Sequence, residues 1–223
     1  LLCRHPGSTF PPVVWFVRLM FSVSRLAFVP DFKSLKKQLR LQALARRDAL
    51  PLDWRVEMSL KIAEDGAREL AVLAGEVVSS FMPMRSEVDV RPLMAAMAEK
   101  GGRICVPAIL DKTTIEFREL VRGAPLIDMG FGTVGPGPEA AVLDPVLMLM
   151  PLAAFDHRGH RIGYGAGYYD RAIDRLHAKG LRPRLIAIAW DCQEVDNVPD
   201  ESHDVQLDAV LTESGLRRFN RCG

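Results

Sequence analysis

Residues 146–171 read VLMLMPLAAFDHRGHRIGYGAGYYDR, and they give the clearest indication of the fold. It opens with an apolar run, residues 146–155, whose beginning is typical of a central strand covered on both faces of a parallel sheet. Glycines then occupy every second position of residues 163–167, the glycine loop, where they leave backbone N–H groups uncovered and can adopt φ > 0. A helical pattern follows from Tyr168. Strand, glycine loop and helix N-terminus together predict a cradle for an anion such as phosphate.

The spacing of the glycine loop matches neither of two familiar phosphate-binding motifs. A Walker loop ends in Gly-Lys-Ser/Thr and a dinucleotide fingerprint has the pattern GxGxxG, and the loop has neither. A flexible turn before a helix is therefore an alternative interpretation of the same glycines.

The rest of the chain alternates between helical and strand patterns. Helices are predicted over residues 31–50, 53–74, 90–100 and 168–179, and strands over 76–82, 103–107, 115–120, 184–190 and 209–212. This alternation predicts a single three-layer α/β domain with a mostly parallel, Rossmann-like sheet. Residues 115–120 alternate with period two and predict an antiparallel edge strand or hairpin. Residues 121–145, rich in Gly and Pro, are expected to form a long loop.

The composition is that of an ordinary globular enzyme with one sizeable core. Of the 223 residues, 48% are hydrophobic and 26% charged, and the net charge is +1. This balance gives no support for a nucleic-acid partner. The longest uncharged apolar piece is too short for a spanning helix, so no membrane partner is expected.

The cysteines and histidines give no metal or disulfide pattern. Four cysteines, at positions 3, 105, 192 and 222, lie far apart and form no CxxC pair. This spacing argues against a zinc knuckle or a disulfide framework and fits a reducing compartment, so we expect a cytoplasmic protein. His157 and His160 could suggest a metal pair, but no third Cys, His or Glu has the right spacing for zinc.

Residues 1–30 differ from the rest of the chain. They contain basic residues but no acid before Asp31, a pattern that resembles a targeting peptide. The interpretation we favour is a dispensable extension, translated from upstream of a true start such as Met20. We therefore expect residues 1–30 to be disordered or non-native and residues 31–223 to form the catalytic domain.

Charged residues outside the glycine loop could complete a phosphate site. Lys36 and Arg40 are four residues apart on one face of the first predicted helix, where they could meet a polyphosphate. A basic face that is merely solvated is the alternative. Arg161 would neutralise further phosphate charge. Asp170 and Asp204 could share Mg²⁺ with phosphate oxygens, since this ion prefers a few carboxylates together with phosphate and water.

Glu87 is a candidate for contact with a second ligand. It lies in the loop after the predicted strand 76–82, and ligands gather at the carboxyl ends of strands in parallel sheets. Alternatively, Glu87 only caps the helix that follows. The chain has no Gly-x-Ser-x-Gly elbow and no placed Cys–His pair, which argues against a hydrolase.

Taken in order, these residues resemble 5-formyltetrahydrofolate cyclo-ligase, also called methenyltetrahydrofolate synthetase. The resemblance covers about residues 33–212. It rests on Lys36-x-x-Leu39-Arg40, Glu87-Val88-Asp89, residues 151–156, Gly159-x-Arg161 with the block that continues to Arg171, and residues 199–204. The block of glycines and tyrosines is the specific element. Two features depart from the family: Ala166, where the family commonly has Gly or Lys, and the first thirty residues.

The resemblance implies an ATP- and magnesium-dependent ring closure. ATP phosphorylates the formyl oxygen of 5-formyltetrahydrofolate, N10 attacks the activated carbon, and phosphate leaves to give 5,10-methenyltetrahydrofolate and ADP. Such an enzyme must position its substrates and neutralise charge more than it must supply a nucleophile. The implied partners are these small molecules, and we expect a monomer.

The resemblance also implies roles for individual residues. ATP would be bound by Lys36, Arg40, Arg161, Ile162, Gly163, Tyr164, Gly165, Ala166, Gly167, Tyr168 and Tyr169. The folate would be bound by Met82, Glu87, Tyr164, Gly165, Ala166, Gly167 and Tyr168. Asp170 and Asp204 would hold Mg²⁺, and Arg161 and Tyr168 would act in catalysis. Packing is the alternative for both adjacent tyrosines, and we expect a ligand role for Tyr168 before Tyr169.

Two other functions fit the same residues. One is an ATP-dependent enzyme on the same scaffold that acts on a different formylated or carboxylated small molecule. The other is a non-catalytic module that binds a nucleotide or a folate without turnover. The joint presence of two acids, the basic pair and Glu87 argues against the module, and a substrate panel with nucleotide turnover would separate the two enzymes.

Overall fold

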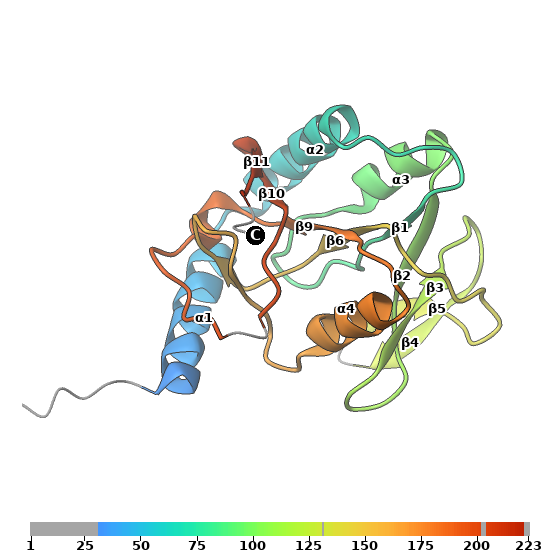
Figure 1. Ribbon diagram of the computed structural model, residues 1–223. Helices are drawn as coiled ribbons and strands as arrows, with labels where there is room; N and C mark the ends of the chain where they lie inside the picture. Colours follow the sequence, from blue (N-terminus) through green and yellow to red (C-terminus); the bar gives the residue numbers. More distant parts are fainter. Residues whose placement is uncertain (1–30, 131, 202–203, 221–223) are drawn as a thin grey trace, which may run out of the picture. The chain divides into compact units, whose positions relative to one another are not determined.

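The computed structural model describes residues 31–130, 132–201 and 204–220, within which seven strands form the main sheet (Figure 1). The strand order is β11-β10-β9-β6-β1-β2-β3. In that order the strands span Gly215–Arg218, Ala209–Thr212, Arg184–Ile188, Leu147–Met150, Val77–Ser79, Arg103–Ile109 and Ile115–Glu119. The pairs from β10 to β2 are parallel, whereas β11 and β3 are antiparallel edge strands. The predicted sheet is confirmed, and the expectation for residues 1–30 lies outside the described residues.

The central strand β6 shows why helices cover both faces of the sheet. All four of its side chains are fully buried. Leu147 and Leu149 join the apolar cluster that includes residues of α2 (Leu52–Glu69) and α3 (Arg91–Glu99). Met148 and Met150 join the cluster that includes residues of α4 (Tyr168–Ala178). Successive side chains of a strand point to opposite faces, so one apolar strand contributes to two layers.

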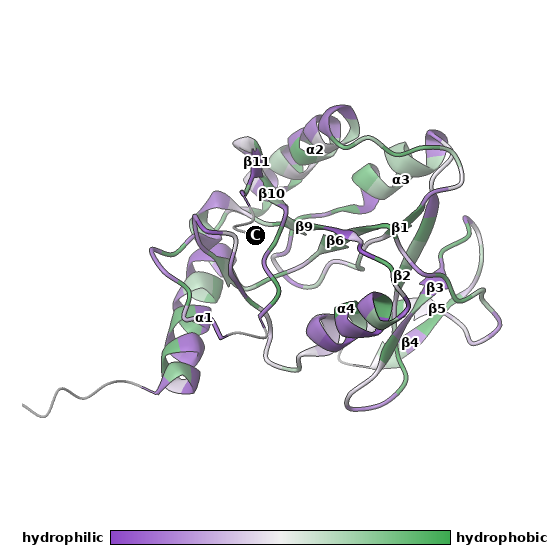
Figure 2. Ribbon diagram, in the orientation of Figure 1, coloured by the Kyte–Doolittle hydropathy of each residue, from purple (hydrophilic) through white to green (hydrophobic). Residues whose placement is uncertain are grey.

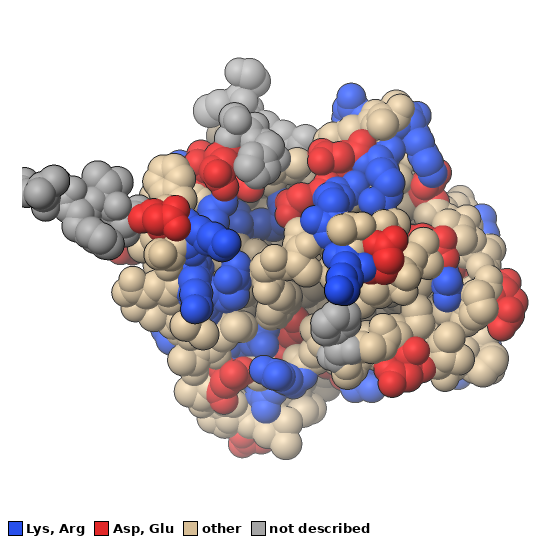
Figure 3. Space-filling model, turned by 90° about the horizontal axis from the view of Figure 1, so that it is seen from below, with Lys and Arg blue, Asp and Glu red and all other residues tan. Residues whose placement is uncertain are grey.

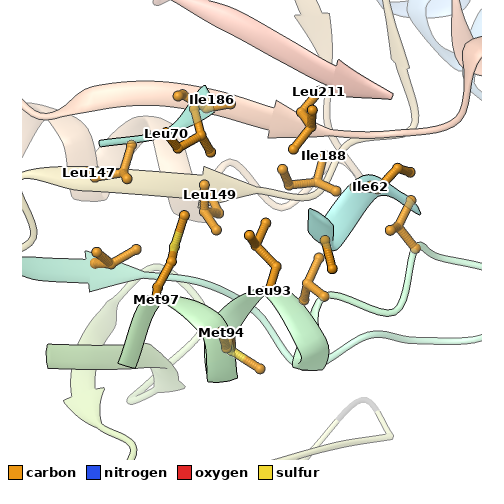
Figure 4. Packing of buried hydrophobic residues seen from close by; sticks show 14 of the residues in the cluster. Ile62, Leu70, Leu93, Met94, Met97, Leu147, Leu149, Ile186, Ile188 and Leu211 are labelled. Atoms are coloured by element: carbon orange, nitrogen blue, oxygen red, sulfur yellow. The ribbon is translucent and has the colours of Figure 1, made fainter. Parts of the chain in front are cut away.

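The helices are amphipathic, with hydrophobic and hydrophilic residues both present along α2 and α4 (Figure 2). On the α2–α3 side, Ile62, Leu93 and Met97 point from the helices toward strand residues such as Leu149 (Figure 4). Each of these side chains is at most 1% exposed. Truncating one of them to Ala would lower the free energy of unfolding by about 2–5 kcal/mol. None of the helices in the described ranges combines the length and apolar character needed to cross a membrane.

The topology places a crevice beside β1. The chain passes from β1 to β2 on one side, and β6 pairs with the other side of β1. At such a switch point the segments that leave neighbouring strands diverge, and ligands of α/β proteins bind between them. Here these segments are residues 80–90 and 151–167, which carry Glu87 and the glycine loop. The fold therefore brings together residues from distant parts of the sequence.

The prediction of one long loop over residues 121–145 is wrong for its middle part. Strands β4 (Leu126–Gly130) and β5 (Thr133–Pro136) form an antiparallel pair there. Gly130 and Gly132 have φ values of 79° and 78°, so they serve the turn between the two strands. Three of the glycines that suggested an irregular loop, at positions 130, 132 and 135, are hairpin residues.

Some predicted elements are shorter than expected. The helix predicted to reach residue 74 ends at Glu69. The apolar run 146–155 divides into β6 and the short strand β7 (Ala154–Phe155), which pairs with β8 (Arg161–Ile162). Pro151 follows β6 directly and has no N–H group to continue the ladder. This break redirects the chain so that the glycine loop begins at the edge of the sheet.

Candidate active site

Two cavities meet at the glycine loop. The smaller has a volume of about 170 Å³ and the larger about 470 Å³. Both are lined by Arg161, Gly163, Gly167 and Asp170. Tyr164, Ala166 and Tyr168 line only the larger cavity, whereas Gly165 lines only the smaller. The glycine loop is thus a thin wall between two sites.

Two glycines of the loop adopt conformations that other residues rarely accept. Gly165 has a φ of 102°, and Gly167 has a φ of 64° and is the N-cap of α4. A Cβ atom at Gly167 would lie 2.9 Å from Nη1 of Arg171. The Arg171 side chain could move away, so it is the left-handed backbone that favours glycine at the start of the helix.

Helix α1 (Phe32–Asp48) supplies the basic side of the smaller cavity. Lys36 Nζ donates to Asp204 Oδ2 at 2.7 Å and to Glu201 Oε2 at 3.3 Å. Burial disfavours the charged amine, but the two acids outweigh it and raise the pKa of Lys36. Arg40 Nε donates to the carbonyl oxygen of Gly163 at 2.7 Å. The predicted basic face therefore lies against the glycine loop and is not merely solvated.

The remaining charges of the smaller cavity are also paired. Arg161 donates to a carboxylate oxygen of Asp170 and to the carbonyl oxygen of Val205. Seen from below the orientation of Figure 1, clusters of Lys and Arg lie beside Asp and Glu, with no continuous basic face (Figure 3). Arg161 and Asp170 thus hold each other in place beside the smaller cavity.

Two of the carboxylates beside the smaller cavity, Asp170 and Asp204, are the predicted metal ligands. Asp170 and Asp204 line the same cavity, as a shared ion would require. The described part of the chain holds no cluster of three Asp, Glu, His or Cys residues suited to a metal. Asp170 is paired with Arg161 and Asp204 with Lys36. These residues fit a Mg²⁺ ion that is completed by phosphate oxygens and water, but not a resident metal held by the protein alone.

Glu87 lines the larger cavity, as Met82 does. Its side chain is only 5% exposed. Its Oε2 accepts from the backbone N–H of Met84 at 2.8 Å, and its Oε1 accepts from the hydroxyl of Tyr164. Burial raises the pKa of Glu87, and these two hydrogen bonds and the charge of Arg47 oppose that rise only in part. The carboxyl holds the turn of its own loop and faces the cavity.

Arg47 is a site residue that the sequence interpretation missed. It is 3% exposed, and its guanidinium donates to Ser86 Oγ at 2.9 Å and to the hydroxyl of Tyr164 at 2.6 Å. Its Nη1 lies 3.7 Å from Oε1 of Glu87. Arg47 follows Arg40 by seven residues, which is two helical turns, so a continuation of the basic face was the available signal.

The two adjacent tyrosines differ in their partners. The hydroxyl of Tyr168 donates to the carbonyl oxygen of Asp111 at 3.2 Å, so it ties α4 to the turn between β2 and β3. The hydroxyl of Tyr169 is buried and has no hydrogen-bond partner among the described residues. Both side chains line the larger cavity. The preference for Tyr168 over Tyr169 as a ligand residue stays a prediction. The Tyr169 hydroxyl has no partner among the described residues, so it too could bond to a ligand.

The predicted ATP and folate residues therefore divide between the two cavities. The smaller cavity is lined by Lys36, Arg40, Arg161, Ile162, Gly163, Gly165 and Gly167. The larger is lined by Met82, Glu87, Tyr164, Ala166, Gly167, Tyr168 and Tyr169. Neither set contains a cysteine. Burial raises the pKa of the Cys105 thiol in β2 to about 12, so this thiol stays protonated and is not a nucleophile at neutral pH. The arrangement can hold a charged group beside an apolar ligand and can neutralise charge between them.

Comparison with known proteins gives a consistent result. Residues 32–213 match the model of the 5-formyltetrahydrofolate cyclo-ligase family. The chain is 27% identical over 175 residues to 5-formyltetrahydrofolate cyclo-ligase of Escherichia coli strain K12, covering 76% of this chain and 95% of that protein. It is 27% identical over 194 residues to the enzyme of the same name from Mus musculus, covering 81% and 94%.

Solved structures of similar proteins share the fold. The 5,10-methenyltetrahydrofolate synthetase of Aquifex aeolicus aligns with a TM-score of 0.71 and 27% identity, covering 85% of this chain and 94% of that one. The 5,10-methenyltetrahydrofolate synthetase of Mycoplasma pneumoniae aligns with a TM-score of 0.64 and 25% identity, covering 79% and 97%.

Proposed function

The chain belongs to the 5-formyltetrahydrofolate cyclo-ligase family, and on that premise we propose that it converts 5-formyltetrahydrofolate to 5,10-methenyltetrahydrofolate with ATP as co-substrate. ADP and phosphate are the other products. The observation that supports this most strongly is the glycine loop, which separates a small charged cavity from a larger one with a buried carboxylate. Two substrates can therefore meet across one short segment of backbone.

The chemistry requires activation of a poor leaving group. The oxygen of the formyl group on N5 attacks the γ-phosphorus of ATP, and the bond between that phosphorus and the bridging oxygen of ADP breaks. The lone pair of N10 then attacks the activated formyl carbon, and N10 loses its proton to water. The carbon–oxygen bond breaks last, and phosphate departs with the original formyl oxygen. No protein nucleophile is needed, so correct positioning and charge stabilisation supply the rate enhancement.

The residues of the smaller cavity would bind the phosphates. Lys36 and Arg40 approach from α1, and Arg161 borders both cavities, so it can stabilise charge on the phosphoryl group in transfer. Asp170 and Asp204 would hold Mg²⁺, which would supply further charge neutralisation when bound. The cations that now pair with these acids would turn to the phosphates.

The residues of the larger cavity would bind the folate. Glu87 would accept hydrogen bonds from N–H groups of the pteridine, and Met82 would contact its ring. Tyr164 and Tyr168 would place the formyl group near the glycine loop, with Tyr168 beside the reacting atoms. We further propose that residues 31–223 are the catalytic domain, which acts in the cytoplasm as a monomer on these small molecules.

The test is turnover with a labelled substrate. Purified protein is mixed with ATP, Mg²⁺ and 5-formyltetrahydrofolate that carries ¹⁸O in the formyl group. We expect one ADP for each 5,10-methenyltetrahydrofolate formed, and ¹⁸O in the released phosphate. Absence of the methenyl product contradicts the proposed reaction. Formation of the product with unlabelled phosphate contradicts only the phosphorylated formyl intermediate.

A further inference from the structure

Arg85, at the larger cavity, has an unusual backbone. Its φ is 54°, and it is the only non-glycine residue with a positive φ among those the structure describes. A bulky residue rarely adopts this conformation, and such strain is common at binding sites. The turn is closed on both sides of Arg85, because Glu87 N donates to the Met84 carbonyl oxygen at 3.0 Å and Met84 N donates to Glu87 Oε2 at 2.8 Å. The left-handed residue therefore belongs to the loop that carries Glu87.

The side chain of Arg85 differs from the other arginines that line the larger cavity. Arg47 is bonded to Tyr164 and Ser86, and Arg161 is paired with Asp170. The Arg85 side chain is exposed and forms no hydrogen bond or ion pair with any other described residue. Only its backbone carbonyl oxygen is engaged, by Arg55 Nη1 at 3.3 Å. One positive charge at the cavity is thus left for a ligand.

The two ends of the loop give the cavity a polarity. The Glu87 side chain is 5% exposed, whereas Arg85, two residues earlier, is exposed. A ligand that fits this arrangement has N–H donors at its buried end and an anionic group at its exposed end. Asp48 also lines the cavity, with a side chain that is 51% exposed. Its negative charge would repel an anionic group of the ligand if no cation stood nearby. An anionic group at the mouth therefore needs a cation there.

We propose that Arg85 binds a carboxylate of the glutamyl end of the folate and so favours glutamylated substrates over unglutamylated ones. The inference rests on the proposed function, since 5-formyltetrahydrofolate joins a pteridine rich in N–H donors to a glutamate. With the pteridine at Glu87, the glutamyl end extends toward the mouth of the cavity, where the guanidinium can form paired hydrogen bonds with a carboxylate.

The test compares three substrates: 5-formyltetrahydropteroate, which has no glutamate, 5-formyltetrahydrofolate, and its triglutamate form. Arg85→Asn removes the charge, and Asn tolerates the left-handed backbone, so the loop is preserved. Arg85→Lys keeps the charge. Arg91→Asn is the matched control, because Arg91 is an exposed arginine that is paired with Asp89 and does not line either cavity.

We expect Arg85→Asn to raise the KM for 5-formyltetrahydrofolate about 3- to 10-fold and to raise the KM for the triglutamate at least as much. The KM for the pteroate should change by less than about twofold, and Arg85→Lys should recover part of the loss. An unchanged folate KM, or an equal rise for the pteroate, overturns the assignment of Arg85. If the unaltered protein turns over none of the three substrates, the proposed function fails and this inference fails with it.

Discussion

The two cavities beside the glycine loop handle charge in different ways. In the smaller, of about 170 Å³, two of the three cations are paired with carboxylates, Lys36 with Asp204 and Arg161 with Asp170. In the larger, of about 470 Å³, the buried carboxylate of Glu87 is held by hydrogen bonds from a tyrosine and a backbone N–H. Paired ions can exchange for a phosphate and a metal together, whereas a buried carboxylate selects a ligand that brings hydrogen-bond donors.

This difference explains why glycines occupy every second position of the loop. A wall that separates two substrates while letting their reacting atoms meet must be thin. Glycines at 163, 165 and 167 expose backbone to the smaller cavity, and the residues between them point only into the larger. Gly165 lines only the smaller cavity, whereas Tyr164 and Ala166 line only the larger, so one loop forms part of both surfaces.

The largest effect is expected from removal of the acid that borders both cavities. Asp170→Asn should lower magnesium-dependent turnover about 100-fold, because a group that holds charge at the transferring phosphoryl is lost. Circular dichroism should show the fold intact. Asp174→Asn, an exposed acid on the same helix, is the control and should retain full activity. Unchanged kinetics of Asp170→Asn would remove this residue from the metal site.

A change confined to the smaller cavity should affect only the nucleotide. Lys36→Ala should raise the apparent KM for ATP about 10-fold, since a charge-assisted contact to phosphate is lost. The KM for folate should change by less than about twofold, because Lys36 does not line the larger cavity. Lys37→Ala removes an exposed neighbouring lysine and should leave both constants unchanged. A larger effect on folate than on ATP would contradict the division between the cavities.

A change confined to the larger cavity should affect the KM for folate more than the KM for ATP. It should also remove the dependence of kcat/KM for folate on pH in the acidic range. Glu87→Gln should raise the KM for folate about 5-fold, more than the KM for ATP, because a charged acceptor becomes neutral. Burial raises the pKa of Glu87 above the ordinary 4.5, so the ionised form, and with it kcat/KM for folate, is lost as the pH falls through that raised value.

The pH profile separates this role of Glu87 from capping. With Glu87→Gln the acidic limb of kcat/KM for folate should flatten, since no carboxyl titrates at that position. If Glu87 only closes its turn, the variant should lose stability while the pH profile keeps its shape. A greater rise in the KM for ATP than for folate would overturn the assignment.

The smallest effect is expected from removal of the Tyr168 hydroxyl alone, because the ring that we propose lies beside the reacting atoms is kept. Tyr168→Phe keeps the ring in the wall of the larger cavity but removes the hydrogen bond to the carbonyl oxygen of Asp111. The free energy of unfolding, measured with urea, should fall by about 1 kcal/mol. Lost turnover without lost stability would show that the hydroxyl acts on the substrate and not on the turn between β2 and β3.

Much of this arrangement was predictable because it depends on local patterns. The apolar run of β6, the glycine loop and α4 follow one another in sequence, and their order predicts a sheet with a ligand at its edge. The basic pair on α1 and Glu87 follow from helical periodicity and from strand ends. These features are encoded within a few residues of where they act.

Arg47 and the hairpin β4–β5 depend on contacts between distant segments. Arg46 and Arg47 are chemically identical neighbours. Arg46 donates to the carbonyl oxygen of Cys192 at 2.7 Å on the surface, whereas Arg47 is buried beside Tyr164. Only packing of α1 distinguishes them. The glycines of residues 121–145 fit a loop and a tight hairpin turn equally well, so the pairing of β4 with β5 could not be read from them.

Simultaneous binding of the two ligands shows most directly whether the glycine loop separates two sites. Titration of 5-formyltetrahydrofolate into the protein saturated with a non-hydrolysable ATP analogue and Mg²⁺ should show one folate bound per chain, with affinity at least equal to that without the nucleotide. That result is predicted if the glycine loop separates two sites. Displacement of the nucleotide analogue by the folate would contradict it, because the two ligands would then share one cavity.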